Sequence, residues 1–439
     1  MSVASPVRRQ RRSTLRTSRC TALLLSIAVF PSAGMMVFYA SSMTAGLSVA
    51  LLAVLLVLAS QGPPRWSVRA QRTALTALAA LVLHSVIAAF VTGEFDAVRA
   101  IGSAAILGLM VISAWTLACA LNRMPASRAD PAFKRCFAVL GCFGIAAALG
   151  VPSVGPFVSH PKPVIFFIEP SHYALALLPF AGYVLSTLTG WRRLLLDAAI
   201  VSLALRLESF TLLVGMVAML ALLLDFKQLL VVGCAAAVLL GSSAIETDYF
   251  AARVDLSDEN QNLSKLAFLQ GWERASLALQ TTRGIGQGFQ QFGVSGPLGD
   301  IQELISNTIG AYINLLDGGT TASKLIGEFG AAGVVLLIAY AYAVLRAALA
   351  LRRQVMHHQP GQSQRIFFLA CICTSSIELF VRGVGYLSPG LFLLIVGLMG
   401  WRQSIGRPAP VRTHVRRKRE RVGLAVTIEP ASAATRVVR

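Results

Sequence analysis

Ionisable residues are rare in this chain, and several of them form short motifs at the ends of apolar runs. One such motif, Glu169-Pro170-Ser171-His172, precedes an apolar run. Proline suits the first turn of a helix, because its missing N–H has no intrahelical partner there. The free N–H groups and dipole of a helix N-terminus favour an anion, here either the Glu169 carboxylate or a phosphate. The motif therefore predicts an anion-favouring helix start, with simple capping by Glu169 and His172 as the alternative.

Two further pairs have the four-residue spacing that places both side chains on one helix face. Lys324 and Glu328 open one apolar run, whereas Glu378 and Arg382 close another. A charged side chain at the centre of a membrane helix costs about 2.5–3.5 kcal/mol on insertion scales, and ionisable groups within membrane segments tend to be functional or paired. Each pair is therefore either part of a site or a local ion pair.

The longest polar stretch, from about residue 244 to 324, has helix signals of its own. Asn262 can cap a helix in which Leu263, Leu266, Leu269 and Trp272 share one face. This pattern predicts an amphipathic helix lying on the membrane surface.

Three alternating glycines, Gly284, Gly286 and Gly288, follow that helix. They do not form a dinucleotide-binding fingerprint, because the spacing differs and no strand precedes them. The glycines either bring backbone amides close to a ligand or form a plain turn.

The elements that must position these residues are membrane helices. The chain is 55% hydrophobic and only 13% charged, whereas soluble proteins carry about 25% charged residues. Apolar runs long enough to cross a ~30 Å hydrocarbon layer recur along it. We therefore expect an all-α polytopic membrane protein with about twelve transmembrane helices and one long extracytoplasmic loop that contains short amphipathic helices. The predicted spans are 20–40, 43–60, 73–92, 99–121, 134–151, 170–189, 193–207, 209–225, 228–244, 325–349, 366–382 and 386–402.

Basic residues are concentrated in every second predicted loop, all on one side, whereas the short loops of the opposite side hold few. This bias places both termini in the cytoplasm by the positive-inside rule. The net charge of +19 then reflects topology and attraction to anionic lipid, and no nucleic-acid partner is expected. The predicted parts are a basic N-terminal tail (1–19), spans one to nine (20–243), the extracytoplasmic loop (244–324), spans ten to twelve (325–402) and a basic, disordered C-terminal tail (403–439).

In their order and predicted topology, these motifs resemble bacterial oligosaccharide repeat-unit polymerases, the Wzy-type polymerases within the O-antigen ligase/polymerase family. The chain departs from relatives before Glu169, where they often carry an arginine and a glycine and this sequence has 162–168 instead. The resemblance rests on Glu169-Pro170-Ser171-His172, Gly271-Trp272-Glu273-Arg274, Gly284-x-Gly286-x-Gly288-Phe289, Asp317-Gly318 with Lys324-x-x-x-Glu328-Phe329-Gly330, and Arg382-Gly383.

The resemblance implies a glycosyltransferase of the bacterial inner membrane that joins repeat units carried on undecaprenyl diphosphate. The diphosphate ester carries the activation, so no cofactor and no metal are expected. The implied base is Glu169 or His172, with Glu328 as the second choice. The implied partners are the lipid-linked oligosaccharide, membrane lipid and a chain-length regulator protein. The implied diphosphate- and substrate-binding residues are Arg382, Arg206, Arg274, Lys162, Lys324, Trp272, Gly286, Gly288 and Tyr386.

Two alternatives remain open at this stage. An O-antigen ligase, which moves a glycan onto a lipid A core, differs from a polymerase mainly in its acceptor. A transporter or flippase for lipid-linked sugars is typically built from internal repeats with broken helices, and the sequence has no evident repeat.

Overall fold

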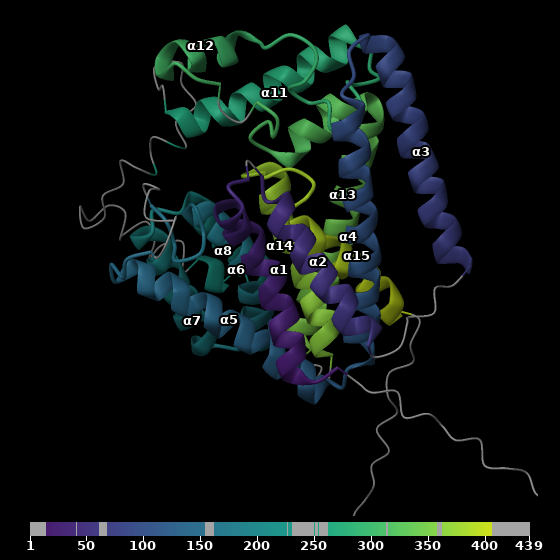
Figure 1. The fold of residues 1–439 in the computed structure, drawn as a ribbon. Coiled ribbons are helices and arrows are strands. Elements are labelled where there is room, and N and C mark those ends of the chain that lie inside the picture. The colour runs from purple at the N-terminus through teal and green to yellow at the C-terminus, as the bar shows by residue number, and fades with distance from the viewer. Residues whose placement is uncertain are drawn as a thin grey trace, which may run out of the picture. The chain divides into compact units, whose positions relative to one another are not determined.

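A computed structural model describes residues 15–40, 42–60, 68–153, 162–225, 227–230, 250, 253, 262–312, 315–357 and 362–405. These residues are predominantly helical (Figure 1), and β pairing among them is limited to the isolated bridges Val164–Phe167 and Phe292–Ser295. The all-α prediction is confirmed. The helices are α1 Thr17–Val37, α2 Thr44–Ala59, α3 Val68–Thr92, α4 Ala97–Arg123, α5 Ala126–Ala148, α6 Pro170–Thr187, α7 Trp191–Arg206, α8 Phe210–Leu223, α11 Leu263–Thr281, α12 Asp300–Ile309, α13 Thr321–Met356, α14 Ser363–Phe380 and α15 Pro389–Ile405.

Six of these helices, namely α1, α3, α4, α5, α13 and α14, are long and apolar enough to cross a membrane, and α2, α8 and α15 are shorter apolar helices. A protein with several membrane-crossing helices is therefore supported, whereas the count of twelve spans stays a prediction. The ninth predicted span, 228–244, and both tails fall almost entirely outside the described residues, as does the first part of the polar loop.

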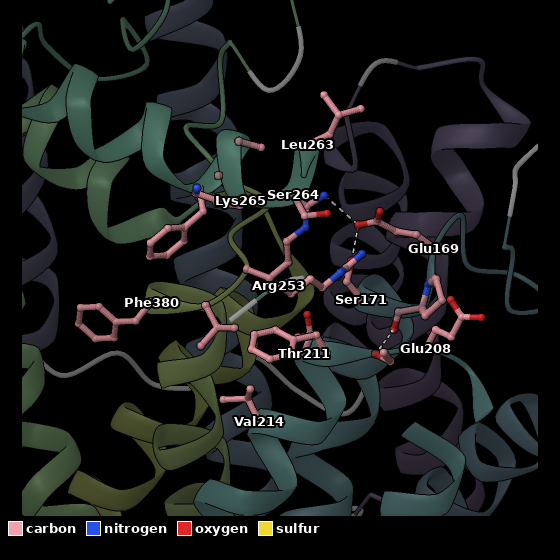
Figure 2. A pocket seen from close by; sticks show the side chains of 18 residues that line it. Glu169, Ser171, Glu208, Thr211, Val214, Arg253, Leu263, Ser264, Lys265 and Phe380 are labelled. Atoms are coloured by element: carbon pink, nitrogen blue, oxygen red, sulfur yellow. Dashed lines mark hydrogen bonds and ion pairs between the residues drawn. The ribbon is translucent and has the colours of Figure 1, made fainter. Parts of the chain in front are cut away.

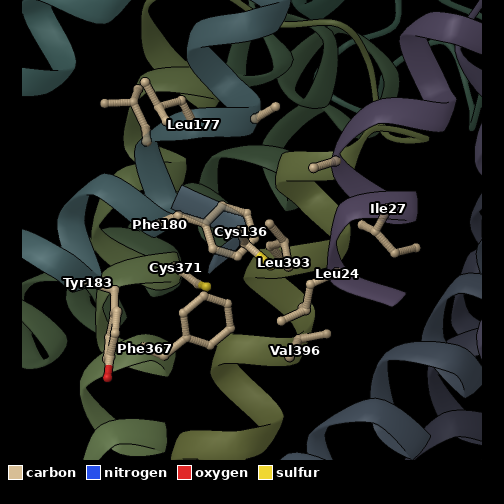
Figure 3. Close-up of a cluster of buried hydrophobic side chains, with 14 of the residues drawn as sticks. Leu24, Ile27, Cys136, Leu177, Phe180, Tyr183, Phe367, Cys371, Leu393 and Val396 are labelled. Atoms are coloured by element: carbon tan, nitrogen blue, oxygen red, sulfur yellow. The ribbon is translucent and has the colours of Figure 1, made fainter. Parts of the chain in front are cut away.

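Helix α6 is the centre of the bundle. Every residue from Tyr173 to Ser186 is buried, and a helix that is apolar on all sides is stable only when other helices surround it. It packs against α5, α8 and α14. Figure 3 shows Leu177 and Phe180 of α6 among side chains from α1, α5, α14 and α15. Its N-terminus, which carries Glu169, is therefore held by a rigid core.

The polar segment, which we define as residues 262–320, contains α11 and α12 and lies at one end of the bundle (Figure 1). Asn262 caps α11 as predicted, because its side-chain oxygen accepts the N–H of Ser264 at 2.9 Å. The buried face of α11 packs on α13 and includes the polar side chains of Gln270 and Arg274. The predicted apolar stripe is only partly that face, since Leu263 is 39% exposed. Helix α11 is thus a packed element of the protein rather than a helix whose only apolar partner is lipid.

Helix α13 connects the polar segment to the bundle through a kink. Gly330 has a φ of 58°, a left-handed conformation that favours glycine. The N–H of Ala331 donates to the carbonyl of Gly284 at 2.8 Å, which anchors the glycine-rich turn, residues 284–288, at the kink. The kink therefore divides α13 into a short part that supports the polar segment and a longer apolar part.

Candidate functional site

A cavity of about 470 Å³ lies where the ends of α6, α8 and α14 meet α11 (Figure 2). Its polar lining contains the carboxylates of Glu169 and Glu208. Its cations are Arg253, Lys265 and Arg382. Three cations against two carboxylates make the cavity attractive to an anion.

Glu169 is the N-cap residue of α6 and makes two ionic contacts at this cavity. Its Oε1 accepts a hydrogen bond from Nη2 of Arg382 at 2.9 Å and lies 3.2 Å from Nε2 of His172. The Ser171 hydroxyl also donates to it. Burial alone would raise the pKa of Glu169, but the charges of Arg382 and His172, with these hydrogen bonds, outweigh burial and lower the pKa to about 2. Glu169 is therefore ionised at neutral pH.

Arg382 follows α14, and backbone hydrogen bonds fix its position. Its own N–H donates to the carbonyl of Ile377, and the N–H of the next residue, Gly383, donates to the carbonyl of Gly319 at 2.9 Å. A Cβ on Gly383 would lie only 2.2 Å from the backbone nitrogen of Thr321. Only glycine allows this approach, so the position of the guanidinium depends on the contact between Gly383 and the start of α13.

The alternative in which Arg382 forms a local ion pair with Glu378 is wrong. The Glu378 carboxylate is buried against the first turn of α15, where a Cβ on Gly390 would lie 1.7 Å from its Oε2. Arg382 instead reaches Glu169, which is 213 residues earlier in the chain. The two members of this pair lie at the ends of different helices, α6 and α14, so helix spacing could not reveal their contact.

Two cavity cations, Arg253 and Lys265, were not among the predicted site residues. Lys265 is only 5% exposed and belongs to the buried face of α11. A lysine within the stripe of an amphipathic helix was a usable signal, because a buried ammonium group requires a partner or a ligand. Arg253 lies in a stretch of sequence that has no motif.

The turn before α8 brings a second carboxylate to the cavity. Ser209 caps α8, and its hydroxyl donates to the carbonyl of Pro170 at 3.3 Å, so the starts of α6 and α8 lie together. Glu208 has a φ of 50°, a conformation that is uncommon for residues other than glycine. It forms an ion pair with Lys162, whose side chain is 55% exposed. Lys162 thus lies beside the cavity rather than within it.

Arg206 does not line the cavity. Its Nε donates to the carbonyl of Ala148 at 3.3 Å at an exposed position.

Other predicted site residues form a second group, the packed cluster of Arg274, Lys324 and Glu328. Glu328 is fully buried, and its two oxygens accept the N–H groups of Gln290 at 2.9 Å and Phe292 at 3.3 Å. Lys324 lies 3.9 Å from Glu328, so the predicted local pair is present. The Glu328 carboxylate therefore fixes the backbone that follows the glycine-rich turn. None of the three residues of the packed cluster lines the cavity.

The two cations of the packed cluster are also directed at the protein itself. Lys324 donates to the carbonyl of Leu316 at 2.6 Å and lies 5.5 Å from the ring of Tyr386. Arg274 donates to the carbonyl of Leu315 at 2.7 Å. Burial lowers the pKa of Arg274 to about 10, although neighbouring Glu273 acts in the opposite direction. Arg274 therefore remains charged at neutral pH and stabilises the polar segment.

The glycine-rich turn contacts α13. The N–H of Gly288 donates to the carbonyl of Glu328 at 2.8 Å, and a Cβ on Gly286 would lie 2.5 Å from the same oxygen. The predicted alternative of a structural turn therefore describes Gly286 and Gly288. Trp272 packs against the hydrophobic core and lies outside the cavity lining.

No group of three or more His, Cys, Asp or Glu side chains that could hold a metal ion occurs among the described residues. Comparisons with family models, with curated proteins and with solved structures gave no match.

Proposed function

We propose that this chain is a membrane glycosyltransferase that polymerises oligosaccharide repeat units carried on a polyprenyl diphosphate such as undecaprenyl diphosphate, with the cavity as its active site. The observation that supports this most is the convergence of Arg253, Lys265 and Arg382 on one cavity at the ends of apolar helices. A lipid-linked diphosphate needs that combination of cations and adjoining apolar surface. The proposal includes a bacterial inner-membrane location, cytoplasmic termini and a partner protein that regulates chain length.

In the proposed reaction, a hydroxyl of one repeat unit attacks the anomeric carbon at the reducing end of the other chain. A new carbon–oxygen bond forms, and the bond between the anomeric carbon and the diphosphate oxygen breaks. The departing diphosphate gains negative charge, which Arg382, Lys265 and Arg253 stabilise. Because the diphosphate is already an activated leaving group, the reaction consumes no nucleotide.

The proton of the attacking hydroxyl passes to the Glu169–His172 pair. Glu169 alone is a weak base in the resting site, since its pKa is about 2. A bound diphosphate competes with Glu169 for Arg382. As the guanidinium turns toward the phosphates, the carboxylate loses its main counter-charge and its proton affinity rises. Substrate binding thereby prepares the base.

The decisive experiment is deletion of the gene in its source organism, followed by complementation with Arg382→Ala and Glu169→Ala. We expect loss of long glycan with retention of acceptor carrying a single unit, and normal levels of inserted protein. Loss of both long and single-unit glycan would instead indicate a ligase, whose donor site has the same chemistry. Polymer of wild-type length from both variants would remove these residues from the site.

A further inference from the structure

A second, smaller cavity follows the first along the same helices. It has a volume of about 190 Å³ and is lined by α8, α13 and α14. On α8 the first cavity ends at Val214, and the second begins at Gly215. On α14 the two are separated by less than one turn, between Ile377 and Phe380.

One face of α8 lines both cavities. Phe210 and Val214 belong to the first cavity, and Ala218 and Leu222 belong to the second. Residues four apart lie above one another on a helix, so these side chains form one continuous stripe along α8. With a rise of about 1.5 Å per residue, the 14 residues of α8 give this stripe a length of roughly 20 Å.

The lining of the second cavity offers no evident polar partner to a ligand. Its hydroxyl groups are used within α14: Thr374 donates to the carbonyl of Ala370 at 2.9 Å, and Ser376 donates to that of Cys373 at 2.6 Å. The other lining residues, among them Met219 and Val344, are small or apolar. Water and sugars gain little in such a place, whereas a hydrocarbon chain does not need polar partners.

We propose that the α8/α14 groove, lined by Val214, Ala218, Leu222, Ile377 and Ala348, holds the hydrocarbon chain of a lipid-linked diphosphate. The inference rests on the proposed function in one respect, that the cation-lined cavity takes the diphosphate. The diphosphate would bind Arg382 and Lys265, and the chain would leave past Val214 along α8. The cation-lined cavity and the apolar cavity follow one another along α8, and they match the diphosphate and the hydrocarbon chain of such a lipid.

The test uses the purified full chain in nanodiscs and measures its binding of inorganic diphosphate, dimethylallyl diphosphate and farnesyl diphosphate. We expect affinity to rise with chain length, by about 100-fold or more from the inorganic ion to farnesyl diphosphate. Ala218→Phe and Ala348→Phe fill the groove and should remove at least about tenfold of that preference, with inorganic diphosphate bound as in wild type.

The matched controls are Val217→Phe and Leu349→Phe, which place the same side chain one residue away, at positions that are 56% and 49% exposed. They should keep the full chain-length preference. The groove is disproved if Ala218→Phe and Ala348→Phe also keep it, if the controls lose as much, or if wild type shows no preference. Should wild type fail to bind inorganic diphosphate, or should Arg382→Ala bind it equally well, the diphosphate site itself is wrong.

Photocrosslinking of wild type serves as a second measurement that does not depend on folded variants. A farnesyl diphosphate analogue with a diazirine at the end of its chain should label the peptides that contain 210–223 and 373–381. Labelling confined to other helices would overturn the proposal.

Discussion

The molecule contains two groups of buried or half-buried charges that look alike in sequence and differ in what their charges contact. The packed cluster joins Glu328 to backbone N–H groups and directs Lys324 and Arg274 at backbone carbonyls. In the cavity, by contrast, Glu169 contacts the side chains of Arg382 and His172 and remains 36% exposed. A charged side chain that is hydrogen-bonded to the backbone stabilises the fold, whereas a charged side chain that faces a cavity can exchange its side-chain partner for a ligand.

The largest effect should follow from Glu328→Ala in the packed cluster. The change leaves the buried N–H groups of Gln290 and Phe292 without their acceptor. It also removes one of the two carboxylates beside Lys324, which keeps Asp317 and the carbonyl of Leu316. Breaking a buried ion pair costs about 3–5 kcal/mol. We expect the polar segment to unfold, as seen by limited proteolysis and by a lower thermal midpoint. Glu303→Ala, at an exposed position in the first turn of α12, should leave both measurements unchanged. A stable Glu328→Ala protein would contradict the comparison.

Arg382→Ala should have the next largest effect, and mainly on function. Removing one cation from a developing charge reduces rates by about 100-fold or more. Diphosphate affinity and glycan polymerisation should both fall, while the thermal midpoint falls less than in Glu328→Ala, because Glu169 is partly exposed and keeps His172 and Ser171 as partners. Arg206→Ala serves as the control, because Arg206 lies outside the cavity lining. Equal losses in the two variants would indicate a general effect of surface charge.

Gly383→Ala tests how the cavity cation is positioned. The added methyl group meets the backbone of Thr321, so the segment that carries Arg382 must move away from α13. We expect diphosphate affinity to fall by about tenfold, less than in Arg382→Ala, because the guanidinium is displaced rather than removed. Gly102→Ala is the control, since no atom lies within 4 Å of a Cβ there. Unchanged affinity in Gly383→Ala would show that the contact with α13 does not position Arg382.

The smallest effect concerns pH. The pKa of Glu169 is lowered to about 2 in the folded protein, from an ordinary value of 4.5. A carboxyl group with a lowered pKa stabilises the fold above its unfolded pKa, and this contribution is lost as the pH falls through the folded value. The difference in thermal midpoint between wild type and Glu169→Gln should therefore be constant above about pH 5 and shrink toward pH 2. A difference that grows over that range would contradict the ion pair.

Local signals in the sequence predicted several features that the structure confirms. Helix α6 begins at Pro170, and Asn262 caps α11. Both signals act within one helical turn, so the neighbouring residues contain the required information. The pair of Lys324 and Glu328 was predictable for the same reason, since four residues separate its members.

Contacts between distant segments were not predictable in this way. The four-residue spacing of Glu378 and Arg382 allowed a pair that the structure does not contain, because Glu378 turns toward α15. The sequence analysis did not single out Lys265, because the cavity beside it is completed by α6, α8 and α14. Gly286 and Gly288 were equally compatible with ligand binding and with packing, and only the position of α13 distinguishes the two.

The sequence by itself determined that this protein is built from apolar helices and where several of them begin, because composition and caps act over a few residues. Only the tertiary structure decided which charges are available to a ligand. That property depends on whether a charged side chain is already hydrogen-bonded to backbone groups of a remote segment. The carboxylate of Glu328 is bonded in this way to the turn at 290–292, whereas the carboxylate of Glu169 contacts side chains.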